Sequence, residues 1–500
     1  MKKPIVILLL LFSFVAAQSP QNNKTNLIII YPDQMRGQAM GFLEQEPVRT
    51  PYLDQFASQS LVFTEAVSNY PICSPTRASL MTGQYPQGHG VWGNCNTITA
   101  PFGYELEEAA QTWSDILKNQ GYSMGYIGKW HLDSPHEPYI NTSNNAGKVK
   151  WNEWTPPSRR HGFDYWYAYG TYDQHNKPMY WTTSANRNSF NYVNQWGPEH
   201  ETDLAIKYIK NEKKNYRDSS QPFALMISMN PPHMPYAAVK DRYKTIYADI
   251  PLEDLIQRPN IPAEGTKWGD YYRKHIRNYY AMITGVDEQF GRILTVLEET
   301  GLEENTIVLF SSDHGNCLGI HDQISKNNHY EESMRIPLII RWPGKISARQ
   351  DNLLISTPDV FPSLLGLLGL TEEISNDIGG TDYSPIFLTG EGERPSSQLY
   401  IYSPPGNKDM GRRGIRTHRY TFMMSRIEGE TDQIELYDNR SDMYQLRNIS
   451  DQRRDIIDDL YTELKIWLKK KMFTLRKFKS EKFKATRNSK FKSGHLQSQT

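Results

Sequence analysis

Several features are scarce in this chain of 500 residues, and each absence narrows what the protein is. Three cysteines, Cys73, Cys95 and Cys317, leave room for one internal disulfide at most. Net charge is zero, yet residues 465–500 hold twelve basic residues and one acid, so the rest of the chain is acidic. An acidic body argues against nucleic acid as the main partner, and the basic end is either a solvated tail or a grip for a polyanion. We find no internal repeats.

The apolar run at the N-terminus, residues 4–17, is shorter than a membrane-spanning helix requires. It follows Met1-Lys2-Lys3 and ends in the small residues Ala16-Ala17, a pattern typical of a secretory signal peptide. We therefore expect a signal peptide over 1–17, a linker over 18–25, and export to the periplasm or beyond without stable membrane insertion. The alternative is an uncleaved anchor.

Short apolar runs alternate with helical patterns over most of the chain. The runs lie at 26–31, 222–229, 306–310 and 336–341, and the helical patterns at 51–58, 112–119, 201–211 and 272–298. This alternation predicts an α/β domain over 26–385, with a large, mostly parallel sheet sandwiched by helices. A smaller antiparallel subdomain with a final helix is expected over 386–471, and a basic tail over 472–500. The polar, aromatic region 141–194 is interpreted as an elaborated loop near the site.

The segment C-S-P-T-R-A-S-L-M-T-G, residues 73–83, is the most informative in the chain. Pro75 suits the first turn of a helix, and Thr82-Gly83 suits its end. Cys73 is therefore expected at a helix N-terminus, where free N–H groups and the helix dipole favour an anion. The alternative is a buried structural cysteine ahead of a capped helix.

Two acidic motifs follow predicted strands. Asp33-Gln34 comes after residues 28–31, and Asp313-His314 comes after residues 307–310. Because the carboxyl ends of parallel strands meet at one edge of an α/β sheet, both motifs are expected to converge with Cys73. Oxygen-rich ligation suits a hard cation such as Ca²⁺. Taken singly, each aspartate is equally typical of a strand-end cap.

Basic and imidazole side chains recur in further motifs. They are Lys129 and His131 in G-K-W-H-L, His233 in N-P-P-H-M-P-Y, Lys326 in S-K-N-N-H-Y-E-E-S, and Arg77 within 73–83. Fixed cations and donors of this kind stabilise an anion most strongly in a transition state. Each alone is also typical of a structural or surface position. His175, Trp196 and His200 either line a substrate pocket or lie at the surface.

Together these motifs resemble the type I, formylglycine-dependent sulfatases of the alkaline phosphatase superfamily. The resemblance runs in order from about residue 26 to residue 448, where L-Y-D and Y-Q-L-R-N are similar to the family's C-terminal segment. It implies that Cys73 is oxidised to formylglycine (3-oxoalanine) by a formylglycine-generating or anaerobic sulfatase-maturing enzyme. One oxygen of the hydrated aldehyde then attacks sulfur, and the other later expels sulfate.

The resemblance also implies a role for each site residue. One Ca²⁺ is held by Asp33, Gln34, Asp313, His314 and the modified Cys73, with Arg77 beside them. Lys129 and Lys326 bind the sulfate, and His175 is a candidate substrate contact. His131 takes a proton from residue 73, and His233 protonates the leaving oxygen. Gln34 and His314 replace residues usual in the family, a pattern also seen in choline sulfatases and phosphonate monoester hydrolases, so strict sulfate preference stays open.

The chain is predicted to be a secreted enzyme that hydrolyses the sulfate esters of a sulfated carbohydrate. An algal polysaccharide such as ulvan or carrageenan is expected, and a glycosaminoglycan is its rival. The alternatives are a phosphodiesterase or phosphonate monoester hydrolase of the same superfamily, or a non-catalytic binder of sulfated glycans if Cys73 stays unmodified. Cys95 and Cys317 are both expected beside the pocket, where they either pair or stay separate thiols.

Overall fold

The computed structural model describes residues 24–376 and 378–470. The predicted signal peptide, most of the predicted linker and all of the predicted basic tail lie outside these residues, so those expectations stay predictions.

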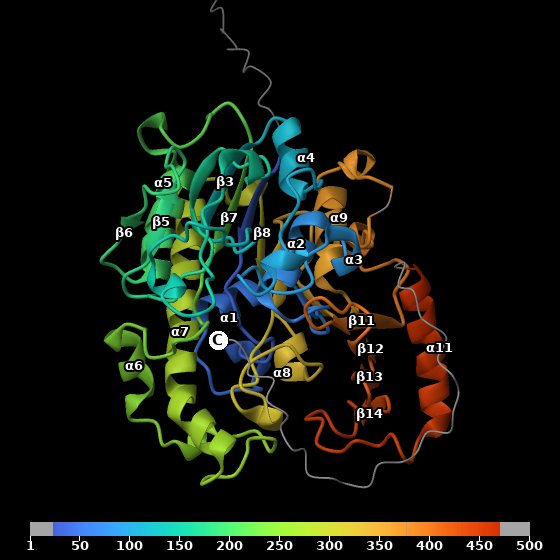
Figure 1. Cartoon of the computed structure of the whole chain (residues 1–500). Coiled ribbons are helices and arrows are strands. Elements are labelled where there is room, and N and C mark those ends of the chain that lie inside the picture. The colour runs from blue at the N-terminus through green and yellow to red at the C-terminus, as the bar shows by residue number, and fades with distance from the viewer. Residues whose placement is uncertain (1–23, 377, 471–500) are drawn as a thin grey trace, which may run out of the picture.

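A ten-stranded sheet forms the centre of the described chain (Figure 1). Its strands lie side by side in the order β10-β2-β9-β8-β1-β7-β3-β4-β5-β6. Parallel pairing joins the five central strands from β8 to β4, and β9, β5 and β6 are antiparallel additions. The predicted large, mostly parallel sheet is confirmed. The strands are β1 (Asn26–Ile30), β2 (Leu61–Phe63), β3 (Ser123–Lys129), β4 (Tyr165–Tyr169), β5 (Met179–Thr182), β6 (Asn191–Tyr192), β7 (Phe223–Ser228), β8 (Thr306–Ser311), β9 (Leu338–Arg341) and β10 (Arg349–Asp351).

Helices bury both faces of this sheet. In β1, Leu27 and Ile29 pack into a core with one set of helices, and Ile28 and Ile30 pack into a core with the other. A strand buried on both faces is an unbroken apolar run, which is why β1 is legible in the sequence. The first set is α2 (Cys73–Thr82), α4 (Trp113–Asn119), α9 (Thr357–Leu367) and α10 (Ser384–Thr389), and the second is α1 (Pro51–Ser58), α5 (Gly197–Lys210), α6 (Asp241–Ala248) and α7 (Lys267–Glu299).

The region 141–194 is not one long loop, and this corrects the sequence interpretation. It contributes β4, β5 and β6 to one edge of the sheet. Its aromatic side chains cause the difference, because Trp166, Tyr169, Tyr180 and Trp181 are buried against the sheet and one another instead of facing a pocket. The segment between β4 and β5, residues 170–178, remains a loop at the carboxyl end of β4.

A second, four-stranded antiparallel sheet follows, as the sequence predicts (Figure 1). It is a meander of β11 (Ser397–Tyr402), β12 (Gly411–Thr417), β13 (Tyr420–Arg426) and β14 (Gln433–Asp438). The final helix α11 (Arg454–Lys470) packs Leu460 and Leu464 against Phe422 and Leu436 of this sheet. The predicted boundary near residue 385 stays a prediction.

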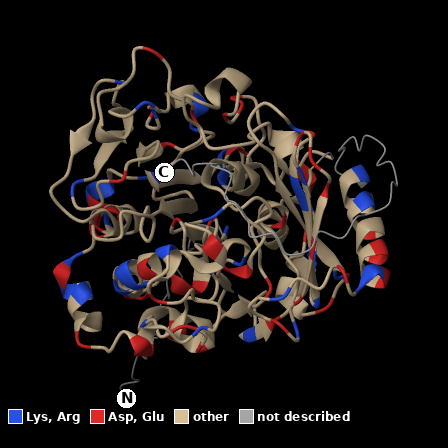
Figure 2. Ribbon diagram, turned by 60° about the horizontal axis from the view of Figure 1, so that its bottom comes forward, with Lys and Arg blue, Asp and Glu red and all other residues tan. Residues whose placement is uncertain are grey.

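Charge is mixed along the helices of the described chain. Figure 2 shows Lys and Arg side by side with Asp and Glu on α11, at the right of the view. None of the described helices combines the length and the apolar character needed to cross a bilayer. Two short helices complete the set, α3 (Pro86–His89) and α8 (Glu331–Met334).

Candidate active site

Helix α2 begins at Cys73, as the sequence predicts, and is buried along its whole length. It ends at Gly83, whose backbone is left-handed with φ of 64°. A Cβ atom at this position would lie 2.5 Å from a ring carbon of Phe361, so a larger residue there would displace the core. The glycine therefore ends the helix within the core. The buried helix in turn holds its N-terminal residue, Cys73, in the protein interior.

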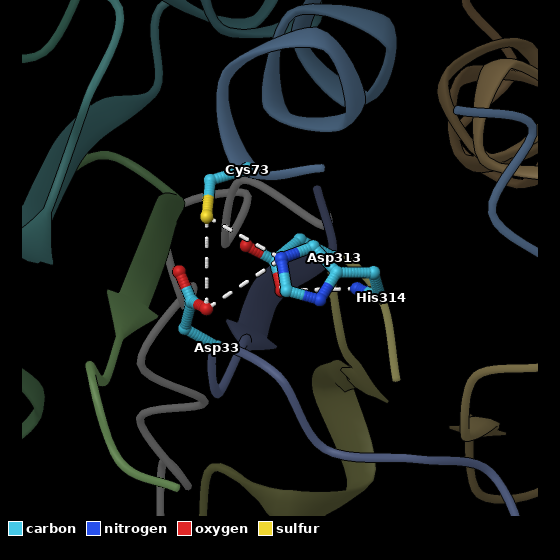
Figure 3. Close-up of side chains that lie close together, drawn as sticks. All are labelled: Asp33, Cys73, Asp313 and His314. Atoms are coloured by element: carbon cyan, nitrogen blue, oxygen red, sulfur yellow. Dashed lines mark hydrogen bonds and ion pairs between the residues drawn. The ribbon is translucent and has the colours of Figure 1, made fainter. Parts of the chain in front are cut away.

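The thiol of Cys73 points into a cluster of charged groups. Figure 3 shows it facing Asp33 and His314. Its Sγ lies 3.3 Å from Nε2 of His314, 3.8 Å from Oδ1 of Asp33, 3.2 Å from Nζ of Lys326 and 4.0 Å from Nζ of Lys129. Burial and Asp33 raise the pKa of the thiol, but Lys129, Lys326 and His314 outweigh them and lower it to about 6. Residue 73 is thus surrounded by groups that stabilise an anion.

The two predicted carboxylates meet because their strands are neighbours. β1 and β8 pair in parallel with Ile30 opposite Phe310, so Asp33 and Asp313 leave the same edge of the sheet. Burial and the nearby Asp33 raise the pKa of Asp313 to about 6. The pKa of Asp33 stays well below its ordinary value although burial opposes this, since Lys129 lies 2.8 Å away. The carboxylates of Asp33 and Asp313 therefore compete for the same nearby positive charges.

The residues present fit a divalent cation. Ligand atoms of Asp33, Cys73, Asp313 and His314 all lie within 4.8 Å of one another. His314 donates its Nδ1–H to the carbonyl of Gly315 at 2.9 Å, which leaves Nε2 as the ligand nitrogen. Two buried carboxylates this close repel each other, and a cation between them removes that repulsion.

Two further groups frame this cluster. Gln34 adopts a left-handed backbone, with φ of 70°, and its Oε1 lies 3.5 Å from Nζ of Lys326. Arg77 reaches both carboxylates, with Nη2 at 3.1 Å from Oδ2 of Asp33 and 3.2 Å from Oδ2 of Asp313. Its Nη1 donates to the carbonyl of Lys129 at 2.9 Å, so Arg77 also fixes the end of β3.

His131 follows β3 and is buried. Its Nε2 lies 3.2 Å from the carbonyl of Cys95, and its Nδ1 has no hydrogen-bond partner among the described residues. Burial, and next the charge of Lys129, hold the pKa of His131 well below its ordinary value, so the ring is neutral. A neutral imidazole with one unpartnered nitrogen fits the predicted proton acceptor.

His233 lies in the loop after β7, with its side chain 15% exposed. Its Nδ1 is 2.8 Å from the carbonyl of Met234 and 3.5 Å from Oδ1 of Asp173. Burial, followed by Lys326 and Lys129, holds the pKa of His233 well below its ordinary value. The protonated ring that a general acid needs is therefore costly unless another group stabilises it.

Sequence reasoning missed two residues of this region, Asn230 and Asp173. Asn230 accepts a hydrogen bond from Nζ of Lys129 at 3.1 Å and donates one to Oδ1 of Asp173 at 3.2 Å. The asparagine lies directly before the P-P-H-M-P-Y motif, so its place after β7 was the one available signal. Nothing in the sequence marks Asp173.

Three other candidate residues pack against protein groups in the structure. His175 is 2% exposed and its Nε2–H donates to the carbonyl of His233 at 2.8 Å, so it supports the loop of His233, and its contact with substrate stays a prediction. Trp196 is fully buried against Tyr243, because its large ring fills the core under α7. His200 pairs with the hydroxyl of Tyr167 at 3.0 Å on α5.

All three cysteines are free and buried. The thiol of Cys95 donates to the carbonyl of Tyr104 at 3.0 Å, and the thiol of Cys317 contacts the side-chain amide of Asn328. The structure therefore favours separate thiols over the Cys95–Cys317 disulfide.

Comparison with known proteins points to one family. The family model described as Sulfatase matches residues 25–370, and that described as N-sulphoglucosamine sulphohydrolase, C-terminal, matches residues 319–477. An endo-4-O-sulfatase of Bacteroides thetaiotaomicron is 40% identical over 90% of this chain and 92% of its own. An ulvan-active sulfatase of Formosa agariphila is 33% identical over 93% of this chain and 84% of its own. The crystal structure of a sulfatase termed yidJ from Bacteroides fragilis is 51% identical, with a TM-score of 0.88 over 92% of this chain and 98% of that one.

Proposed function

Since the chain belongs to the sulfatase family and is a sulfuric ester hydrolase, we propose that its substrate is a sulfated polysaccharide. The similarity to an endo-4-O-sulfatase supports a glycosaminoglycan sulfated at O4 as the first candidate. A solved structure from the metabolism of multiple glycosaminoglycans by Bacteroides thetaiotaomicron is 38% identical to this chain, which supports the same class. The ulvan-active relative, at 33% identity, supports an algal polysaccharide as the second.

Cys73 acts as formylglycine, made by a maturing enzyme. This group supplies a hydrated aldehyde that provides an oxygen nucleophile for sulfur and releases sulfate on returning to the aldehyde. The geometry at residue 73 carries the proposal, because the N-terminus of α2, Lys326 and His314 all converge there. Cys73 is 1% exposed, so the maturing enzyme acts on the chain before it folds.

The side chains around residue 73 divide the work on the sulfate ester. Lys129 and Lys326 neutralise the sulfate oxygens, where negative charge grows as the S–O bond breaks. His131 accepts the proton of residue 73 at its unpartnered Nδ1. His233 donates a proton from Nε2 to the leaving oxygen of the sugar.

The cation would be one Ca²⁺, and Asp33, Gln34, Asp313, His314 and residue 73 would hold it. When bound it draws negative charge off the sulfate oxygens as a Lewis acid. The oxygen-rich donors and the bared Nε2 of His314 support this choice.

Export to the periplasm or beyond follows from the basic start, short apolar run and small residues at 1–17. A polysaccharide too large to cross a membrane requires an enzyme on the same side, which fits this location.

One experiment tests the modification and the substrate together. The protein is produced with a maturing enzyme, the peptide containing Cys73 is examined by mass spectrometry, and sulfate release is measured from an O4-sulfated glycosaminoglycan and from ulvan. We expect formylglycine at residue 73 and release from the first. An unmodified Cys73 in an enzyme with full activity would refute the mechanism, and release from ulvan alone would reassign the substrate. An aryl phosphate diester serves as the control for the related phosphodiesterases.

A further inference from the structure

The ring of His233 is held in a way that dictates which proton it can give. Its Nδ1–H donates to the carbonyl of Met234 at 2.8 Å, so the neutral ring carries its hydrogen on Nδ1 and leaves Nε2 bare. To release a proton from Nε2, the ring must first carry two protons and a positive charge. A carboxylate that faces the ring is the group that would stabilise this positive charge.

Charged groups reach His233 from several elements. Lys326, from the loop after β8, and Lys129, at the end of β3, both disfavour the imidazolium, and Asp33, after β1, favours it. Asp33 is already bonded to Lys129 at 2.8 Å and to Arg77 at 3.1 Å, so little of its charge is left for His233. His175 is buried, and burial lowers its pKa, so it contributes no charge of its own.

Asp173 is a further carboxylate beside the ring of His233, and two side-chain amides hold it in place. Its Oδ2 accepts from the amide of Asn144 at 2.8 Å, and its Oδ1 accepts from the amide of Asn230 at 3.2 Å. Both donors are neutral. Its Oδ1 lies 3.5 Å from Nδ1 of His233, the one ion pair that it forms within the described part of the chain. Its charge also acts on His175 and Lys129, and it raises the pKa of both.

Asn230 links this carboxylate to the sulfate-binding side. Its Oδ1 faces Nζ of Lys129, so its NH₂ group must face Asp173 and the carbonyl of Tyr172. The orientation of the amide is thereby fixed, and Asp173 cannot turn away without losing two hydrogen bonds. Asp173 is 35% exposed in the free enzyme, and a sugar covering the pocket removes that water and strengthens the pair.

We propose that Asp173 is a positioning residue that holds His233 protonated, with Nε2 directed at the leaving oxygen. The proposal rests on the proposed role of His233 as the acid. The proton passes from Nε2 to the oxygen of the breaking S–O bond, and Asp173 keeps its negative charge throughout.

The kinetic test compares Asp173→Asn with wild type on aryl sulfates whose leaving groups range from nitrophenol to unactivated phenol. A good leaving group departs without a proton, so we expect little loss on nitrophenyl sulfate and a loss of about tenfold or more on the poorest leaving group. His233→Ala should give the same pattern, and the double variant should lose no more than His233→Ala alone. Asp164→Asn is the matched control, because Asp164 pairs with Lys118 in a half-exposed salt bridge at the amino end of β4, opposite the end that faces the candidate site.

The second test needs no turnover. The ¹⁵N resonances of His233, assigned by their absence in His233→Ala, are titrated in the calcium-loaded protein, in wild type and in Asp173→Asn. We expect the imidazole to lose its proton at a lower pH in the variant. Asp173→Ala repeats the measurement without the side-chain amide that Asp173→Asn places beside Asn144 and Asn230.

An unchanged titration in both variants, or an equal kinetic loss on every leaving group, would overturn the proposal. If His233→Ala shows no dependence on the leaving group while the titration still shifts, the acid role of His233 fails and the pairing itself stands. The two failures are therefore distinguishable.

Discussion

The two sides of the candidate active site, called walls below, are built differently. The nucleophile wall, made of Asp33, Cys73, Arg77, Asp313 and His314, comes from strand ends and a core helix, and every member is at most 2% exposed. The leaving-group wall, made of Asp173 and His233, comes from the loops after β4 and β7, with side chains 35% and 15% exposed. The wall around the proposed nucleophile is therefore buried and densely paired. The wall around the proposed acid is partly exposed and lies on loops, so differences in substrate range are expected there.

Removing the nucleophile should abolish activity while sparing the fold. Cys73→Ala cannot form the aldehyde, so turnover of any sulfate ester should fall by roughly 10⁴-fold or more. The measurement is steady-state sulfate release, with circular dichroism to confirm folding. Cys317→Ala removes another buried thiol and should retain turnover. Multiple turnover by Cys73→Ala at the wild-type rate would refute the proposed mechanism.

Weakening the cation should damage the nucleophile wall for all substrates alike. Asp313→Asn removes one of two buried carboxylates, so calcium content and rate should fall together, the rate by more than about a hundredfold. Metal analysis and kinetics on the same sample check this. Asp351→Asn, a carboxylate bonded to Arg394 at 2.6 Å, is the control and should keep its calcium. A rate that survives exhaustive chelation would rule out the metal assignment.

Removing the proposed acid should show that the two walls have different roles. His233→Ala should cost about 10²–10⁴-fold on a sugar sulfate, whose alcohol is a poor leaving group, and about tenfold or less on nitrophenyl sulfate. Parallel kinetics on both substrates measure the difference. Equal losses on the two would show that His233 only positions substrate, and the contrast between the walls would then be one of burial alone.

The sequence predicts the residues of the nucleophile wall, whereas it predicts the leaving-group wall only in part. Apolar runs reveal β1, β7 and β8, and acidic residues directly after them reveal Asp33 and Asp313. β3 escapes notice because its sequence S-M-G-Y-I-G-K carries two glycines, which weaken a strand pattern. Asp173 meets Asn230 across 57 residues of chain, and a polar residue in a polar loop gives no periodic signal. His175 was singled out near the pocket, but whether a histidine faces substrate or a carbonyl depends on backbone that the pattern does not specify.

The smallest effect concerns Glu201, which lies behind both walls. Its Oε1 accepts from Tyr180 at 3.0 Å and from Tyr169 at 3.4 Å, and a Cβ on Gly128, the residue before Lys129, would lie 3.4 Å from the same oxygen. Burial raises the pKa of Glu201 from 4.5 to about 8 although both tyrosines oppose this.

Folding therefore binds a proton on Glu201 that the unfolded chain releases, and this fixes the sign of the pH dependence. The stability that Glu201 contributes is fully present below about pH 4.5 and is lost as the pH rises to about 8. Glu201→Gln cannot ionise, so the fall in unfolding free energy between pH 5 and pH 8 should shrink by on the order of 3 kcal/mol. Urea unfolding at both pH values measures it, and leaving-group dependence should not change. An equal fall in wild type and variant would show that Glu201 is ionised in the folded protein, whereas altered leaving-group dependence would place Glu201 within the leaving-group wall.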